Sequence, residues 1–279
     1  MTMNEVFAMR YDLVALDMVG TLLNSDHVTT PYTREVLRRV AEAGGSSVLC
    51  TGRCLSELEK HLAVLPHLHY AVCENGACIY DVREKRAIRQ ISLPMAEVRF
   101  LLETARRFDV LEQCFVENQS YLQPFTPERL EHFNIAAFAG GFREGSRFVE
   151  DLEDCCLSHA SVEKINFFFP DRAECARFVE CLEGHDICLF GSVGIGVEAS
   201  PRHATKAVGL EILYAHLGIP MDRVIAVGDG GNDLEVMRAA GLAVAMGNAI
   251  DEVIGLADVV TEDCDHDGAA RAIERYMLA

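Results

Sequence analysis

Residues 13–21 read LVALDMVGT, and this stretch decides the fold of the chain. Four apolar residues that run into Asp17 and then Gly20-Thr21 are typical of a buried parallel strand with a polar side chain at its carboxyl end. A second apolar run, residues 47–50, enters Thr51-Gly52, and residues 70–73 form a third. Helical spacing of apolar residues connects the first two runs. We therefore predict strand–helix–strand alternation and a parallel, doubly wound α/β sheet.

The pattern changes after residue 81. Most of the phenylalanines lie in the following hundred residues, where helical spacing at 95–107 and 173–182 flanks β-like runs at 114–116 and 165–169. The alternation then resumes with a helix at 206–217, a strand at 223–227 and a helix at 233–240. We therefore predict a doubly wound (Rossmannoid) core formed by residues 1–81 and 188–279, with an α+β cap inserted at residues 82–187.

Composition excludes several classes of protein. The chain has 279 residues, half of them hydrophobic, and a net charge of −18, so a general nucleic-acid binder or a polybasic membrane-surface protein is not expected. No apolar run approaches the roughly 18 residues of a membrane span. Residues 1–12 lack the pattern of a secretory signal, and the odd number of cysteines, 11, includes no C-x-x-C pair. We expect a cytoplasmic protein with reduced thiols and no nucleic-acid or membrane partner.

The strongest chemical signal is an ordered set of polar residues at strand ends. Asp17 and Thr51 follow the first two strands, Lys206 opens a helix, and Asp229 lies in the run Gly-Asp-Gly-Gly-Asn-Asp at 228–233. If these strands share one parallel sheet, their carboxyl ends meet at one crevice. A carboxylate there can attack phosphorus, and further carboxylates can hold Mg²⁺. A hydroxyl, glycine N–H groups and a lysine can bind the remaining phosphate oxygens.

These motifs together resemble the haloacid dehalogenase (HAD) superfamily, in particular its Cof-type sugar-phosphate phosphatases with a large inserted cap. The resemblance begins near residue 11 and runs to the C-terminus. It includes these matches: Thr-Gly-Arg at 51–53, Glu-Asn-Gly-Ala at 74–77, Lys206 followed by Gly209, the 228–233 run, Ala-Met-Gly-Asn-Ala at 245–249, Ala257-Asp258 and Asp267-Gly268.

The resemblance implies a role for each matched residue. Asp17 would be the nucleophile and a ligand of Mg²⁺, the expected cofactor, with Asp229 as a second ligand and Asp233 as its support. Lys206 would bridge the nucleophile and the transferring phosphoryl group of a small phosphorylated metabolite. The remaining phosphate contacts would come from Thr51, Gly52 and Asn232.

Position 19 departs from the family pattern. The family usually has an aspartate two residues after the nucleophile, which protonates the leaving group and then activates water, but this chain has Val19. General acid–base help is typically worth about 10²–10⁴-fold in rate, and valine supplies none. The family uses only the backbone carbonyl of that residue for the metal, so Val19 can still be a metal ligand. The sequence predicts an intact metal and phosphate site with an impaired proton transfer.

Three explanations of Val19 are open. The substrate could be an acyl or other activated phosphate whose leaving group needs no proton. Another group could supply the proton, either a bound water or a side chain such as Glu117, His132 or His203. Catalysis could also be vestigial, which would leave a protein that binds phosphorylated metabolites. A phosphotransferase or mutase is a further alternative, but it needs the same acid–base step.

Overall fold

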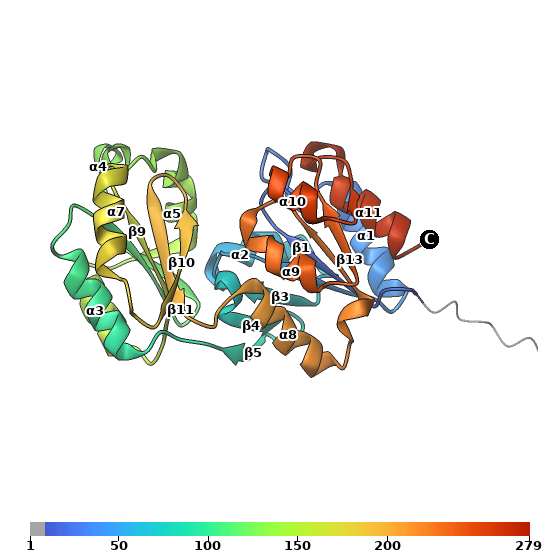
Figure 1. Ribbon diagram of the computed structural model, residues 1–279, viewed down its shortest axis with the longest axis horizontal. Helices are drawn as coiled ribbons and strands as arrows, with labels where there is room; N and C mark the ends of the chain where they lie inside the picture. The colour runs from blue at the N-terminus through green and yellow to red at the C-terminus, as the bar shows by residue number, and fades with distance from the viewer. Residues whose placement is uncertain (1–8) are drawn as a thin grey trace, which may run out of the picture.

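The 13–21 stretch forms strand β1 (Leu13–Asp17) at the centre of an eight-stranded sheet of order β14-β13-β12-β1-β2-β3-β4-β5. The computed structural model describes residues 9–279 (Figure 1). From β14 to β3 the neighbouring strands are parallel, and β4 and β5 extend the edge as antiparallel strands. The other strands of this sheet are β2 (Ser46–Cys50), β3 (Tyr70–Cys73), β4 (Cys78–Asp81), β5 (Arg86–Gln90), β12 (Val224–Gly228), β13 (Leu242–Ala245) and β14 (Val259–Val260).

Helices cover both faces of this sheet. Alternate residues of β1 enter two different apolar clusters: Val14 and Leu16 pack with one group of helices, and Leu13 and Ala15 pack with the other. The first group is α1 (Pro31–Glu42), α2 (Leu55–Ala63) and α11 (Gly268–Tyr276), and the second is α8 (Lys206–Leu217), α9 (Leu234–Ala239) and α10 (Asp251–Leu256). This arrangement confirms the predicted doubly wound α/β core.

The inserted cap has its own sheet and forms a separate lobe beside the core (Figure 1). Its strand order is β10-β11-β9-β6-β7-β8, antiparallel except for the last pair. One face packs against α3 (Met95–Ala105), α6 (Leu152–Ser158) and α7 (Arg172–Cys181). The strands are β6 (Leu111–Val116), β7 (Gln119–Leu122), β8 (Ser146–Phe148), β9 (Val162–Phe168), β10 (Ile187–Ser192) and β11 (Gly196–Pro201), and the remaining helices are α4 (Pro127–His132) and α5 (Ala139–Gly145).

Sheet membership corrects the boundaries expected at residues 82 and 188. Strand β5 pairs with β4 and belongs to the core sheet, because the β4–β5 hairpin continues its edge. Strands β10 and β11 belong to the cap, because β11 pairs antiparallel with β9. The chain therefore passes into the cap between β5 and α3, and returns to the core between β11 and α8.

Two further expectations meet the structure here. All eleven cysteines are unbonded in the structure. Across residues 9–279, none of the helices combines the length and the apolar character that crossing a membrane requires. The expectation about a secretory signal falls largely on residues 1–8, which lie outside the described part of the chain.

Candidate active site

Three adjacent strands of the core sheet bring the predicted residues together. Strand β1 lies between β2 and β12, so Asp17 at its last position is next to Thr51, which follows β2, and Asp229, which follows β12. Parallel pairing fixes this meeting point, since the carboxyl ends of all three strands lie at the same edge.

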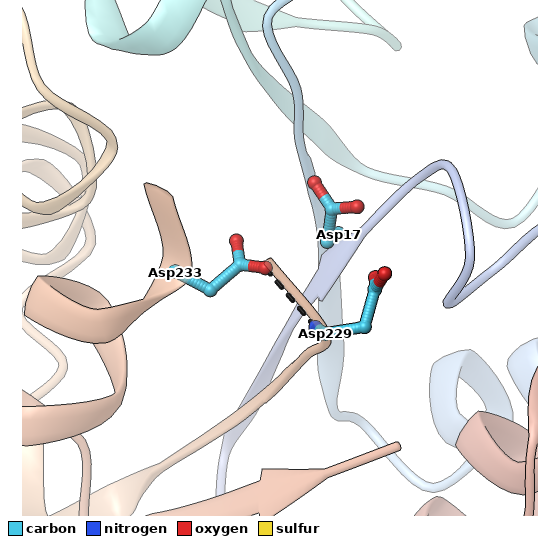
Figure 2. Close-up of side chains that lie close together, drawn as sticks. All are labelled: Asp17, Asp229 and Asp233. Carbon is cyan, nitrogen blue, oxygen red and sulfur yellow. Dashed lines mark hydrogen bonds between the residues drawn. The ribbon is translucent and has the colours of Figure 1, made fainter. Parts of the chain in front are cut away.

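The carboxylates of Asp17, Asp229 and Asp233 form one cluster at this edge (Figure 2). Each contributes an oxygen that lies within 4.8 Å of the other two. Asp233 is the last residue of the short 3₁₀ turn Gly231–Asp233 that follows β12. The 228–233 turn, which contains Asp229 and Asp233, therefore supplies two of the three carboxylates. Like charges this close repel each other unless a cation lies among them.

Lys206 is the cation that the chain itself supplies. It is the first residue of α8, and its side chain is 1% exposed. Its ammonium group donates to Oδ1 of Asp17 and, at 2.7 Å, to Oδ1 of Asp233. Gly209 lets α8 lie this close to the sheet, because a Cβ there would be 2.6 Å from Cγ1 of Val72. Burial alone would lower the pKa of Lys206, but the two carboxylates raise it above its usual value, so the lysine stays protonated.

Hydrogen bonds distinguish the two carboxylates of the 228–233 turn. Asp233 is fully engaged: its Oδ2 accepts from the N–H groups of Asp229 at 3.2 Å and Gly230 at 3.1 Å, while Oδ1 accepts from Lys206. Among residues 9–279, the Asp229 carboxylate accepts a hydrogen bond only from Thr21, whose hydroxyl donates to Oδ1 at 2.8 Å. Asp233 therefore holds the turn in place, and Oδ2 of Asp229 is available to a ligand.

Gly20 keeps the space beside Asp229 open. Its φ is +80°, and a Cβ at this position would lie 2.5 Å from Oδ2 of Asp229. Asn248 holds the same loop from the other side by donating to the carbonyl of Gly20 at 2.8 Å. A side chain at position 20 would thus clash with Oδ2 of Asp229 and block the space in front of it, which explains why the loop after β1 has glycine here.

The pKa values of the clustered carboxyl groups indicate that their negative charges repel one another. Burial, against the opposing effect of Lys206 and with a smaller contribution from the charges of Asp233 and Asp229, raises the pKa of the Asp17 carboxyl to about 7. Burial also raises the pKa of Asp229, against the hydrogen bond from Thr21. A divalent cation would relieve this repulsion, and an all-oxygen donor set of this kind suits Mg²⁺. The donor set and the open space at Gly20 fit such an ion, with Asp17 and Asp229 as its side-chain ligands.

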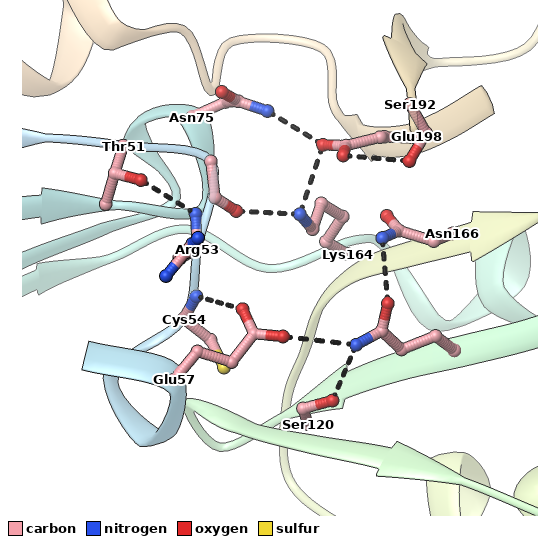
Figure 3. Close-up of polar contacts among 12 residues, drawn as sticks. Thr51, Arg53, Cys54, Glu57, Asn75, Ser120, Lys164, Asn166, Ser192 and Glu198 are labelled. Atoms are coloured by element: carbon pink, nitrogen blue, oxygen red, sulfur yellow. Dashed lines mark hydrogen bonds and ion pairs between the residues drawn. The ribbon is translucent and has the colours of Figure 1, made fainter. Parts of the chain in front are cut away.

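The loop expected to bind phosphate (the phosphate-binding loop) is Thr51-Gly52-Arg53, the turn between β2 and α2. Thr51 is buried, its carbonyl accepts the N–H of Asn75 at 3.0 Å, and its hydroxyl accepts the N–H of Arg53 at 3.2 Å (Figure 3). Gly52 lines the cleft between core and cap, as does Asn232 from the 228–233 turn. The structure thus places Gly52 and Asn232 on one cleft with Lys206.

Val19 lies in the loop after β1 with 44% of its surface exposed. No proton-donating side chain replaces it among the three considered from the sequence. Glu117 lies at the β6–β7 turn and accepts from the N–H of Ala160, His132 pairs with Asp109 on the cap, and His203 is exposed before α8. None of the three lines the cleft.

The cleft has a volume of about 710 Å³, and the cap supplies part of its wall. Sequence reasoning missed these cap residues. They are Cys188, Leu189, Phe190 and Gly191 of β10 and Glu198 of β11, opposite Glu235 and Arg238 of α9. The sequence held one indication of this interface: Lys164 lies within a run rich in apolar residues that forms strand β9. In the structure Lys164 is only 2% exposed, and a lysine buried this deeply normally has a charged partner, here Glu198.

Comparison with known proteins agrees with this geometry. Residues 14–273 match the haloacid dehalogenase-like hydrolase family. Phosphatase YwpJ of Bacillus subtilis (strain 168) is 26% identical over 294 residues, covering 95% of this chain and 99% of YwpJ. Pyridoxal phosphate phosphatase YbhA of Escherichia coli (strain K12) is 26% identical over 287 residues, covering 95% of this chain and 98% of YbhA.

A solved structure shares the whole architecture. The crystal structure of a haloacid dehalogenase-like hydrolase from Bacteroides thetaiotaomicron matches with a TM-score of 0.84 and 29% identity, covering 95% of this chain and 99% of that one. The match extends over both core and cap, since so little of either chain lies outside it. The chain therefore belongs to the haloacid dehalogenase-like hydrolase family, and the phosphatases among its relatives indicate a phosphoric monoester hydrolase.

Proposed function

We propose that the chain is a Mg²⁺-dependent phosphatase that acts on a small phosphorylated metabolite through an aspartyl phosphate on Asp17. The observation that carries this proposal is the cluster of Asp17, Asp229 and Asp233 beside Lys206, which also lines a cleft large enough for a metabolite. The named phosphatases among the relatives support the same reaction class.

Each residue has a defined task in the proposed reaction. Asp17 attacks phosphorus through a carboxylate oxygen, a P–O bond forms, and the bond to the leaving oxygen breaks. Lys206 donates to Asp17 and neutralises charge beside the transferring group. A bound Mg²⁺ would supply charge neutralisation at the phosphate oxygens, held by Asp17, Asp229 and the carbonyl of Val19. Water then cleaves the acyl phosphate, which releases inorganic phosphate and regenerates Asp17.

Val19 narrows the proposed substrates. An acyl or aryl phosphate has a leaving group stable as an anion, whereas an alkyl phosphate needs a proton on its leaving oxygen. Both oxygens of Glu198, a carboxyl group in the cleft, already accept hydrogen bonds: Oε2 from Lys164 at 3.1 Å and Asn75 at 2.9 Å, and Oε1 from Ser192 at 3.2 Å, so this side chain is not placed to protonate a leaving group. We therefore propose that activated phosphates are hydrolysed faster than alkyl sugar phosphates.

The test is phosphate release from p-nitrophenyl phosphate and acetyl phosphate, with Mg²⁺ and with EDTA. We expect turnover only with Mg²⁺, and its loss in Asp17→Asn, since an amide cannot attack phosphorus. Asp154→Asn is the matched control, because Asp154 is an exposed residue of α6 in the cap. Turnover that survives EDTA or Asp17→Asn would contradict the proposed mechanism. If the protein binds phosphate with Mg²⁺ but never turns over, it is instead a phosphometabolite-binding protein, the second function that Val19 favours.

A further inference from the structure

We propose that Lys164, in the cap, is a positioning residue that orients the phosphate-binding loop of the core through hydrogen bonds ending at the Thr51 hydroxyl. Lys164 can have this role only if the loop holds a phosphoryl group, so the proposal rests on the proposed function. It assigns the cap a part in phosphate binding in addition to forming the wall of the cleft.

The fold buries Lys164 between the two lobes. Side chains alternate along β9: Ile165 and Phe167 enter the apolar cluster beneath α3, α6 and α7, so Lys164 and Asn166 lie on the opposite face. Lys164 is 2% exposed, and its ammonium group lies 4.2 Å from the centre of the Phe115 ring. Burying a lysine this deeply is costly unless its charge is paired and hydrogen-bonded.

The partners of Lys164 come from both lobes (Figure 3). Its ammonium group donates to the carbonyl of Gly52 at 2.8 Å and to Glu198 of the neighbouring cap strand at 3.1 Å. Glu198 in turn accepts from Asn75 of the core at 2.9 Å and from Ser192 of β10 at 3.2 Å. Burial alone would lower the pKa of Lys164, but Glu198 and other nearby carboxylates raise it, so the donor remains charged.

The contact at Gly52 has a consequence for Thr51. The peptide between Gly52 and Arg53 is planar, with its C=O and N–H pointing in opposite directions. When Lys164 holds the C=O, the N–H of Arg53 is directed to the Thr51 hydroxyl oxygen, at 3.2 Å. That oxygen is then an acceptor in the loop, which leaves the hydroxyl proton free to donate to a phosphate oxygen. A charged donor at one end of such a chain also polarises the bonds that follow it.

Lys164 could instead merely hold the two lobes together (a clamp), and its loss would then have different effects from those expected if it acts on Thr51 through Gly52 and Arg53 (a relay). The interface has other contacts of this kind, such as the exposed ion pair at 2.6 Å between Lys60 of α2 and Glu144 of α5. Lys60 has no contact with the phosphate-binding loop among the hydrogen bonds of the described residues. Lys60→Met therefore makes the same chemical change at the same interface and is the matched control for Lys164→Met.

The experiment is a double-mutant cycle between Lys164→Met and Thr51→Ala. Binding of inorganic phosphate to the Mg²⁺-saturated protein is measured by calorimetry, together with KM and kcat for p-nitrophenyl phosphate and the melting temperature of every variant. We expect each single substitution to weaken phosphate binding and raise KM by about tenfold, the effect of losing one charge-assisted hydrogen bond. The double variant should be no weaker than Thr51→Ala alone, because the lysine acts through the threonine. Lys164→Arg should restore part of the loss.

The outcomes separate the two proposals. If the wild-type protein binds phosphate and Thr51→Ala weakens it, but Lys164→Met does not, the relay is wrong and the proposed function stands. Effects of Lys164→Met that add to those of Thr51→Ala, or that Lys60→Met reproduces, would show a clamp and overturn the relay. If the wild-type protein neither binds phosphate nor hydrolyses the substrate, the proposed function fails. Lys164→Gln, which keeps an N–H donor, replaces Lys164→Met in the cycle if the latter does not fold.

Discussion

At the scale of single residues, the site combines a complete charge cluster with one missing acid. Lys206, Asp17 and Asp233 are joined by hydrogen bonds in a buried setting, and Gly20 keeps Asp229 accessible. Val19 stands where the family usually has an acid. Its side chain is 44% exposed, has no proton to donate and does not belong to the cluster. In the proposed reaction these two features affect different steps: the cluster acts in phosphoryl transfer, and the missing acid at position 19 impairs protonation of the leaving group.

Val19→Asp should therefore raise the hydrolysis of alkyl sugar phosphates by about 10²–10⁴-fold, the usual contribution of general acid–base catalysis. Hydrolysis of acetyl phosphate should change far less, because its leaving group needs no proton. The exposed position makes the substitution compatible with the fold. Phosphate release from both substrates, measured side by side, checks this.

Val19→Asn is the control for Val19→Asp, since it has nearly the same shape and cannot donate a carboxyl proton. An equal gain in both variants would show that polarity at position 19, rather than proton transfer, limits the reaction. No gain with the alkyl phosphate in Val19→Asp would mean that another step is limiting.

At the scale of elements, helix α2 contacts the phosphate-binding loop through His61. His61 of α2 is 6% exposed, and its Nε2 lies 3.3 Å from the guanidinium of Arg53. Because a guanidinium only donates, this ring nitrogen is the acceptor and the histidine is neutral. Burial and the charge of Arg53 together lower the pKa of His61 to about 4.

His61 should therefore reduce the stability of the protein as the pH falls from 7 to 5, whereas Asp17, whose folded pKa of about 7 lies above its unfolded value, acts in the opposite direction and does so equally in a His61 variant. The pKa of His61 is near 6.5 in the unfolded chain and about 4 in the folded protein. The unfolded state therefore binds more protons in this interval, and this proton binding stabilises it relative to the folded state. His61→Gln keeps a polar side chain without titrating. We expect the fall in unfolding free energy to be smaller in His61→Gln by roughly 1–2 kcal/mol.

Urea unfolding of both proteins at pH 7.5 and pH 5 measures that difference. His69, whose pKa burial also lowers to about 4, titrates in the same interval and accounts for part of the remaining loss in either protein. A pH dependence that is the same in His61→Gln and in the wild-type protein would contradict the assignment of a buried neutral His61.

At the scale of the whole molecule, core and cap have separate apolar interiors joined by polar contacts. The cap interior centres on Phe178, which is fully buried and lies 4.6 Å from Phe167 and 5.1 Å from Phe169 between ring centres. The contacts between the lobes include hydrogen bonds, such as that from Lys164 to Gly52, and the ion pair of Lys60 with Glu144. The three clustered carboxylates that could hold a metal ion all lie in the core.

Phe178→Ala should therefore destabilise the cap by about 3–5 kcal/mol, the usual cost of removing a buried aromatic ring. Binding of Mg²⁺ should be unchanged, because its ligands belong to the other lobe. Differential scanning calorimetry measures the first effect, and a Mg²⁺ titration of the variant measures the second. A parallel loss of Mg²⁺ affinity would show that the two lobes fold as one cooperative unit.

The strand-end residues could be predicted because strand pattern and site chemistry coincide in them. Apolar runs that end at Asp17 or Thr51 indicate both a parallel strand and the edge at which its side chain lies. The helix at 206–217 was predicted with its observed bounds, since Thr205 caps it and Gly218 ends it in the left-handed conformation. The strands β10 and β11 were not assigned to the cap, because a run of mixed side chains does not reveal which sheet it joins.

The sequence by itself determined the α/β core, the order of its strands' polar ends and the family. These depend on local pattern: apolar period, turn residues and the spacing of a few carboxylates. Only the tertiary structure decided that Asp233 is a support with both oxygens engaged, that cap strand β11 supplies Glu198 to the cleft, and that Lys164 contacts Gly52. Residues 52 and 164 lie far apart in the chain, and the packing of one lobe against the other, which no local pattern encodes, brings them within hydrogen-bond distance.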